Sequence, residues 1–246
     1  MIPKIIHYCW FGGAPLPEDT LTYIETWRRC CPDYEIKEWN EDTFDINQIP
    51  YVKEAYKSKK YAFVADFVRL YALYHEGGIY MDTDVEVIKP LDDLLDNYAF
   101  SGFEDNNSIS TGIMASEKGG KWAYDNMTYY LDKHFEKANG QLDMTTNVAI
   151  ITKYMLQYGV KLDNTLQEFP QLITIYPKDW FCPKSHNSGR IFLTSNSYTI
   201  HHFANSWEDK GVKYRINKFT HRLICRIFGE NGHDNVVNVI RKFIKP

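Results

Sequence analysis

Three short apolar segments stand out in the first ninety residues of the chain. Their apolar residues follow one another or alternate with polar residues, which is typical of β-strands. They comprise residues 4–10, 34–40 and 79–88. The stretches between them are long enough for helices, so we expect the strands to lie parallel.

Helical periodicity fills the two intervening stretches. Residues 17–31 begin with a proline and two acidic residues and repeat apolar residues on one helical face. Residues 52–76 keep a helical pattern until the glycine pair 77–78 ends it, so one long helix is expected there. The resulting β-α-β-α-β order predicts an α/β fold, in which helices cover a parallel sheet.

The rest of the chain continues the alternation of strands and helices. We expect strands at 98–104, 111–116, 172–181 and 198–203, and helices at 119–137 and 145–158. Because no repeat or linker divides the chain, residues 1–210 are predicted to form one domain, followed by a partly helical tail, 211–246.

The tail differs from the domain in charge. It holds eight Lys or Arg residues against Glu230 and Asp234, whereas the whole chain has a formal net charge of −4. Apolar residues at three- and four-residue steps with basic neighbours favour amphipathic helices that bind an anionic membrane surface. The alternative is that these apolar residues pack on the domain and the charges face water.

Composition limits the remaining classes of function. The 246 residues are 44% hydrophobic and 24% charged, as in ordinary globular proteins, and the net negative charge argues against nucleic-acid binding. Five cysteines without a CxxC pair indicate reduced thiols. The N-terminal segment lacks a signal-peptide pattern, and no run reaches the ~18 apolar residues of a membrane span. A cytoplasmic protein is expected, with peripheral contact to the inner membrane face.

Two aspartates, Asp82 and Asp84, stand where the third strand gives way to a loop. Carboxylates at positions i and i+2 can converge on one hard cation such as Mg²⁺ or Mn²⁺. Such a cation can neutralise the charge on a departing nucleotide diphosphate. The alternative is an exposed acidic turn of the kind common in loops.

A second pair of charged residues, Asp66 and Arg69, lies in the apolar helix before that strand. Their spacing places them on the same side of the helix. A partly buried pair could hydrogen-bond sugar hydroxyls, whereas a surface ion pair would do little. Trp10 and the glycines that follow it could similarly stack on a nucleobase and let a nucleotide approach, or Trp10 could belong to the core.

The segment "HHFANSW", residues 201–207, follows the last expected strand. His202 could complete a metal site, and Ser206 and Trp207 could donate hydrogen bonds to a phosphate. The alternative is a helix start capped by Asn205 or Ser206.

Together, "IPKIIHYCWFGG", "YAFVADFVRLYALYHEGGIYMDTDVEV" and "HHFANSW" resemble the DxD glycosyltransferases of family 32 and the catalytic domain of the large glucosylating bacterial toxins. The resemblance implies a GT-A fold with a mostly parallel sheet and a Mn²⁺ or Mg²⁺ cofactor. It implies retaining transfer of a hexose or N-acetylhexosamine from a nucleotide-sugar, expected to be a UDP-sugar, to a glycan or lipid-linked oligosaccharide. Bacterial capsular, exo- or lipopolysaccharide synthesis is the expected setting.

The same resemblance implies roles for individual residues. The expected catalytic residues are Asp66, Arg69, Asp82 and Asp84. The expected metal ligands are Asp84, Asp82 and His202. The residues expected to bind the nucleotide-sugar are Tyr8, Trp10, Asp66, Arg69, Asp82, Thr83, Asn147, Ser206 and Trp207.

Two other functions stay open. A haloacid-dehalogenase-like phosphatase also places a D-x-D motif after an apolar strand, but that motif normally opens the chain. A non-catalytic module that binds nucleotide-sugars would keep the fold without turnover.

Overall fold

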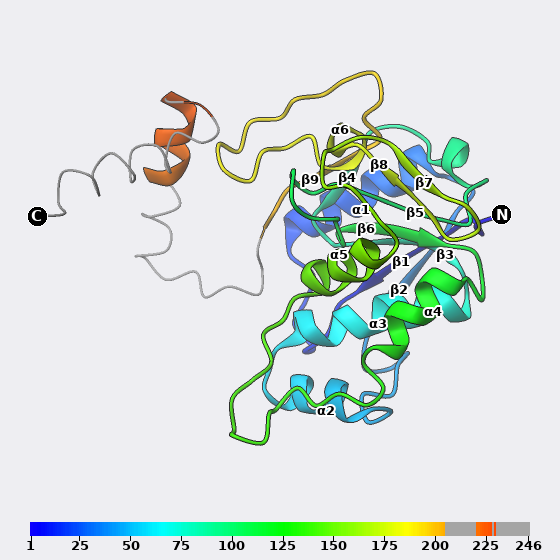
Figure 1. Cartoon of the computed structure of the whole chain (residues 1–246), viewed down its shortest axis with the longest axis vertical. Helices are drawn as coiled ribbons and strands as arrows, with labels where there is room; N and C mark the ends of the chain where they lie inside the picture. The colour runs from blue at the N-terminus through cyan, green and yellow to red at the C-terminus, as the bar shows by residue number, and fades with distance from the viewer. Residues whose placement is uncertain (205–219, 228, 230–246) are drawn as a thin grey trace, which may run out of the picture.

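The computed structural model describes residues 1–204, 220–227 and 229 of the chain (Figure 1). The predicted site residues Ser206 and Trp207, together with most of the expected tail, lie outside these described residues. A helix long and apolar enough to cross a membrane is not found among the described residues.

A seven-stranded sheet forms the centre of the fold, in the order β2-β1-β3-β6-β5-β8-β7. Its strands are β1 Ile5–Cys9, β2 Glu35–Trp39, β3 Gly78–Met81, β5 Ala99–Gly102, β6 Ile113–Ser116, β7 Gln167–Phe169 and β8 Ile173–Tyr176. β1 pairs in parallel with β2 and β3, and β5 with β8, whereas β6 and β7 run antiparallel to their neighbours. Five of the seven strands therefore point in one direction, which confirms the predicted α/β fold with a mostly parallel sheet.

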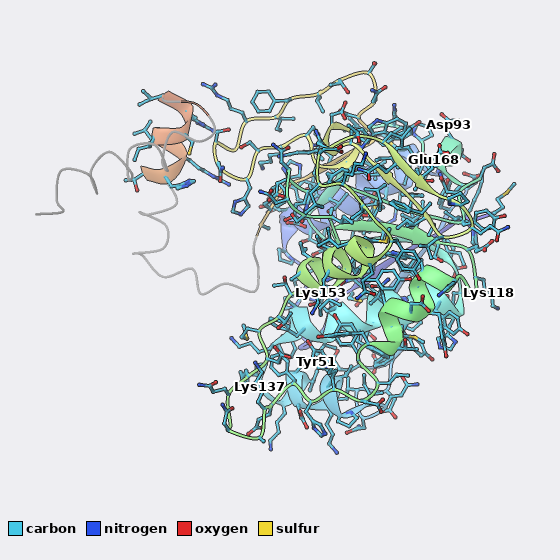
Figure 2. The ribbon with its side chains drawn as sticks, in the orientation of Figure 1. Tyr51, Asp93, Lys118, Lys137, Lys153 and Glu168 are labelled. Atoms are coloured by element: carbon cyan, nitrogen blue, oxygen red, sulfur yellow. The ribbon has the colours of Figure 1, made fainter. Side chains whose placement is uncertain are left out.

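Helices cover both faces of this sheet (Figure 1). They are α1 Glu18–Cys30, α2 Pro50–Lys57, α3 Tyr61–His75, α4 Lys121–Thr128, α5 Asn147–Gln157 and α6 Lys178–Phe181, with a short 3₁₀ turn at Asp92–Leu94. One hydrophobic core joins the sheet to α2, α3, α4 and α5, and Tyr51 of α2, labelled in Figure 2, packs in it against Tyr130 and Phe135. A second core on the other face contains residues of α1 and α6.

A small second sheet lies in the second core and pairs two segments far apart in sequence. Its strands, β4 Val85–Val87 and β9 Thr199–His201, are antiparallel, with Val85 opposite His201. The expected strand 79–88 is therefore split at Asp82–Asp84, because the chain leaves the central sheet after β3 and joins β9 instead. This split turns the two aspartates into the corner between the sheets.

The single helix expected at 52–76 was wrong, since two helices occupy this segment. Lys59 adopts a left-handed backbone conformation with φ of 55°, and the Lys60 N–H donates to the Ala55 carbonyl at 2.9 Å. The left-handed residue after a helix is usually a glycine. Because a lysine takes this position here, the sequence does not reveal that the helix ends. Similarly, the strand expected at 172–181 ends at Tyr176, because Pro177 caps the short helix α6.

Candidate active site

The candidate site lies at the carboxyl ends of the parallel strands β1 and β3. Trp10 directly follows β1 and Asp82 directly follows β3. Because β6 runs antiparallel beside β3, Gly112, which precedes β6, lies at the same edge, and its carbonyl accepts a hydrogen bond from the Asp82 N–H at 2.8 Å. Ligands of α/β sheets commonly bind at this edge.

Helix α1 fixes the strand that follows the aspartates. The Trp27 indole Nε1 donates to the Val85 carbonyl at 2.7 Å, and the Thr26 hydroxyl accepts from the Val87 N–H at 2.9 Å. Both bonds are buried, so they hold β4 against α1 and fix the direction in which Asp82 and Asp84 leave the sheet.

Asp82, Asp84 and His201 form a cluster that could hold a metal ion, with ligand atoms within 4.8 Å of one another. The β4–β9 pairing brings His201 there, and its Nε2 lies 3.2 Å from Asp84 Oδ1 and 4.0 Å from Asp82 Oδ2. A side chain on Gly112 would place its Cβ 2.7 Å from the His201 ring, so the bare backbone of this glycine gives the imidazole its place. Two carboxylates and one imidazole suit a divalent cation such as Mn²⁺, and these residues therefore fit the expected cofactor.

The electrostatics of this cluster keep the Asp84 carboxylate charged. Burial alone would raise the pKa of Asp84, but the charge of His201 and hydrogen bonds from His201 and the Ala204 N–H hold it at about 2. The Ala204 N–H lies 2.6 Å from Asp84 Oδ2. Burial alone would lower the pKa of His201, but Asp84 outweighs it and holds this pKa well above its ordinary value.

His202, the histidine named from the sequence, lies outside this cluster. Its Nε2 lies 2.9 Å from Glu86 Oε2, its Nδ1 lies 3.1 Å from the Lys184 amine, and its ring stacks on Tyr23. Successive residues at the end of a strand point to opposite sides, so only one histidine of the pair can face the aspartates. The geometry favours His201, and the sequence alone does not reveal which side of β9 faces the site.

Arg69 on α3 connects Asp66 to Asp82. Its Nη2 lies 3.2 Å from Asp66 Oδ1 and its Nη1 lies 3.4 Å from Asp82 Oδ1. Nη1 also donates to the Thr111 carbonyl at 2.9 Å, and the guanidinium lies over the Tyr80 ring. Asp66 and Arg69 are both buried, so this pair is not the exposed ion pair kept as an alternative.

Asp66 also contacts the first residue of α5, Asn147. The Asn147 N–H donates to Asp66 Oδ2 at 3.2 Å, and its Nδ2 donates to the Asp66 carbonyl at 2.7 Å. Burial raises the pKa of Asp66 to about 6, although the charge of Arg69 opposes this rise. The Asn147 Oδ1 is buried and has no hydrogen-bond partner among the described residues. The structure thus brings together Asp66 and Asn147, which are 81 residues apart in sequence, and leaves the Asn147 Oδ1 able to accept a hydrogen bond.

The residues expected near the nucleobase lie at or beside the same sheet edge. Trp10 is half-buried and its indole donates to the Ala14 carbonyl at 2.6 Å. The Tyr8 hydroxyl donates to Glu38 Oε2 at 2.6 Å, so it already has a protein partner. Thr83 is half-buried between the two aspartates. Contacts of these residues with a nucleotide stay predictions.

Glu104 is a candidate that the sequence analysis missed. It comes two residues after β5, at the same edge of the sheet as Asp82. Burial raises its pKa, and the charge of His201 partly opposes this effect. Within the described part of the chain its carboxylate has no hydrogen-bond or ion-pair partner. Its position after an apolar strand is a signal in the sequence, but only the strand order β3-β6-β5 shows that this strand ends near Asp82.

Comparison with known proteins connects this geometry to one family. Residues 17–101, which include Asp66, Arg69 and both aspartates of the turn, match the family model "Glycosyltransferase sugar-binding region containing DXD motif". Inositol phosphoceramide mannosyltransferase 3 of Schizosaccharomyces pombe is 34% identical over 122 residues, which cover 48% of this chain and 34% of the relative. An uncharacterised glycosyltransferase of Acanthamoeba polyphaga mimivirus is 26% identical and covers 95% of this chain and 90% of its own length. The chain thus spans about a third of the yeast relative.

Solved structures resemble the chain more distantly. The glycosyltransferase GlyE of Streptococcus pneumoniae aligns with a TM-score of 0.48 at 13% identity, covering 92% of this chain and 63% of that protein. The PaToxG glycosyltransferase aligns with a TM-score of 0.47 at 18% identity, covering 64% and 70%. The topology of the chain itself is a mostly parallel sheet with the aspartate turn directly after β3. This topology agrees with the expected GT-A fold. Over residues 17–101, about a third of its length, the chain is therefore similar to the glycosyltransferases whose sugar-binding region contains a DXD motif.

Proposed function

We propose that the chain is a metal-dependent retaining glycosyltransferase that moves a sugar from a nucleotide-sugar to a glycan or lipid-linked acceptor. The observation that carries this proposal is the cluster of Asp82, Asp84 and His201, joined through Arg69 to Asp66. A cation site and a buried carboxylate meet here at the ligand-binding edge of the sheet. The family match over residues 17–101, which include Asp66, Arg69, Asp82 and Asp84 but not His201, supports this function.

The three clustered side chains would hold Mn²⁺ or Mg²⁺. A divalent cation in this position neutralises the negative charge that builds on a departing diphosphate. The chain contributes rigidity, since the Ala204 N–H and the imidazole of His201 orient Asp84, and Arg69 and the Tyr80 hydroxyl orient Asp82. Preorganised groups of this kind stabilise developing charge without rearranging during the reaction.

Asp66 and Asn147 would bind the donor sugar. Arg69 and the Asn147 N–H hold the Asp66 carboxylate in place, while the unpaired Asn147 Oδ1 can accept a hydrogen bond from a hydroxyl. With a pKa of about 6, Asp66 exchanges its proton near neutral pH and can accept or donate a bond to a sugar hydroxyl. Trp10 would stack on the base, as the resemblance implies. Ser206 and Trp207 keep their proposed contacts with the diphosphate.

Glu104 would bind the acceptor. A carboxylate that is mostly buried yet has no partner in the described residues can accept a hydrogen bond from an incoming hydroxyl. Its place after β5 puts it on the side of Asp82 away from Trp10, since β3 and β6 lie between β1 and β5.

The donor and acceptor are proposed only as classes. The names of the relatives include mannosyl transfer to inositol phosphoceramide in Schizosaccharomyces pombe and an initiation-specific α-1,6-mannosyltransferase of Candida albicans. A mannosyl donor and a glycolipid or glycan acceptor therefore stand beside the UDP-sugar expected from the sequence. Bacterial polysaccharide synthesis and a cytoplasmic location stay predictions.

The alternatives lack a supporting observation. In a phosphatase of the haloacid-dehalogenase type the first aspartate attacks phosphate, whereas Asp82 here is held by the Tyr80 hydroxyl at 2.8 Å and by Arg69. A non-catalytic module would not need Asp66, Arg69 and both aspartates of the turn in one connected group.

A donor panel tests this proposal. UDP-glucose, UDP-galactose, UDP-N-acetylglucosamine and GDP-mannose would each be incubated with the protein and Mn²⁺, and the released nucleoside diphosphate measured. We expect slow hydrolysis of one donor, and NMR spectra recorded before the released sugar mutarotates should show the α anomer as the first product of an α-configured donor. The β anomer as the first product would refute retention, and phosphate release from generic phosphomonoesters would favour the phosphatase.

A further inference from the structure

A hairpin and a helix form a unit at the surface, beyond the central sheet. The hairpin, residues 183–192, connects α6 to β9, and Lys184 pairs with Ile191 across it. Its tip contacts helix 220–227, because the Arg190 guanidinium donates to the Arg226 carbonyl at 3.2 Å and Arg226 Nε donates to the Ser188 carbonyl at 2.9 Å. In Figure 1 this helix (orange) and the hairpin lie on the side of the molecule where β4 and β9 are labelled.

Large apolar side chains are exposed on both parts of this unit. The segment at the end of the hairpin carries three in succession, Ile191, Phe192 and Leu193, of which the last two are more than half exposed, at 52% and 55%. The helix exposes Leu223 and Ile227, which lie one turn apart on the same face, while Cys225 on another face is buried. Continuous exposed apolar residues are uncommon on soluble proteins unless something binds them.

The charge between these two groups of apolar residues is positive. Arg190, Arg222 and Arg226 lie at the contact between the hairpin and the helix, and a Cβ added to Gly189 would lie 3.4 Å from Nε of Arg222. Among the described residues, none of these three arginines forms an ion pair with an acidic side chain. Arginines without acidic partners beside exposed apolar side chains suit an anionic lipid surface, where apolar groups enter the interface and guanidinium groups bind phosphates.

We propose that this hairpin–helix unit docks the protein on an anionic bilayer through Phe192, Leu193 and Ile227. The unit lies beside the cluster of Asp82, Asp84 and His201, because the Lys184 amine lies 3.1 Å from Nδ1 of His202, the neighbour of His201. Docking here would hold the site close to the bilayer and so favour a lipid-linked acceptor. The inference concerns binding alone and does not depend on the proposed activity.

Vesicle co-sedimentation of the full chain tests this surface. The probes are vesicles of phosphatidylcholine with and without phosphatidylglycerol, at low and high salt. We expect binding to the anionic vesicles alone, weakened by salt. The double variant Phe192→Ser/Leu193→Ser and the variant Arg190→Gln/Arg226→Gln should each weaken this binding about tenfold or more.

Leu166→Ser provides the matched control. Leu166 is 50% exposed, similar to Phe192, but precedes β7, the strand marked by Glu168 on the opposite side of Figure 2 from helix 220–227. This variant should bind vesicles like the wild type. The arginine variant leaves the apolar residues unchanged but removes two hydrogen bonds between the hairpin and the helix. The melting temperatures of both variants are therefore compared with that of the wild type, and a variant with the wild-type melting temperature decides the test.

Three results would overturn the proposal. They are no binding of the wild type at low salt, equal binding to neutral vesicles, and binding that neither the serine nor the arginine variant changes. Self-association in gel filtration that the serine variant abolishes, without vesicle binding, would assign the surface to a second copy of the chain instead.

Discussion

Two aspartates of the candidate site, the half-buried Asp84 and the buried Asp66, have opposite electrostatic environments. His201 and the Ala204 N–H hold the pKa of Asp84 at about 2, whereas burial raises the pKa of Asp66 to about 6 in spite of Arg69. The Asp84 carboxylate is therefore charged at neutral pH, whereas the Asp66 carboxylate takes up a proton as the pH falls toward 6. A fixed charge is what a cation site needs, and an exchangeable proton suits a contact with a hydroxyl.

The supporting residues explain this difference. Asp84 lies at a corner between two sheets, where an imidazole and a backbone N–H point directly at its oxygens. Asp66 lies on α3 among residues of the apolar core, and its partner Arg69 also pairs with Asp82. This difference predicts that removing the charge of Asp84 and removing that of Asp66 have different effects on transfer and on stability.

The largest effect is expected for Asp84→Asn. The amide keeps the shape of the side chain but removes a charged ligand, so transfer should fall by roughly 100-fold or more. Turnover of the best donor, assayed with and without excess EDTA, measures this effect. Asp132→Asn changes an exposed aspartate that does not belong to the cluster and should retain wild-type rates. Full activity of Asp84→Asn, or of the wild type in EDTA, would contradict a metal-dependent reaction.

Asp66→Asn should also reduce transfer, but without weakening the fold or the cation site. We expect a loss of about tenfold or more in kcat/KM for the donor, because the amide can no longer act as a charged acceptor for a hydroxyl. The melting temperature at neutral pH should not decrease, since the variant buries no charge. A large decrease in melting temperature with intact transfer would instead make Asp66 a structural residue.

The smallest expected effect is the contribution of Asp66 to the pH dependence of the unfolding free energy. Its pKa of about 6 in the folded protein exceeds the ordinary value of 3.8, so the folded state binds more protons than the unfolded chain between these values. The contribution to stability is complete below about pH 4 and is lost as the pH rises through about 6. Relative to Asp66→Asn, the wild type should therefore lose about 2 to 3 kcal/mol of unfolding free energy between about pH 4 and pH 7. Chemical denaturation of both proteins at the two pH values measures this difference, and parallel pH curves would contradict it.

The sequence predicted the first half of the fold better than the second. Alternating apolar segments before Asp84 correctly gave three adjacent parallel strands and the aspartates at their carboxyl edge, because those contacts are between neighbouring elements. The break at Lys59 was missed, since it depends on one left-handed residue without glycine. The pairing of β4 with β9 joins segments more than 100 residues apart, and no local pattern reports such a contact.

The candidate site shows the same limit. The sequence predicts Asp66, Arg69 and the two aspartates of the turn as one site because they lie within one short motif. The choice between His201 and His202 depends on how β9 is rotated in its sheet, and Glu104 depends on which strand ends are neighbours. Both require the tertiary structure.

The central claim, that Asp82, Asp84 and His201 form the cation site, is tested most directly by the two adjacent histidines. Isothermal titration calorimetry would measure the affinity of the wild type, His201→Gln and His202→Gln for Mn²⁺. His201 lies 3.2 Å from Asp84, whereas its neighbour His202 contacts Glu86. We predict that His201→Gln weakens Mn²⁺ binding about tenfold or more and that His202→Gln binds Mn²⁺ like the wild type. The reverse pattern, or unchanged binding in both variants, would contradict the account.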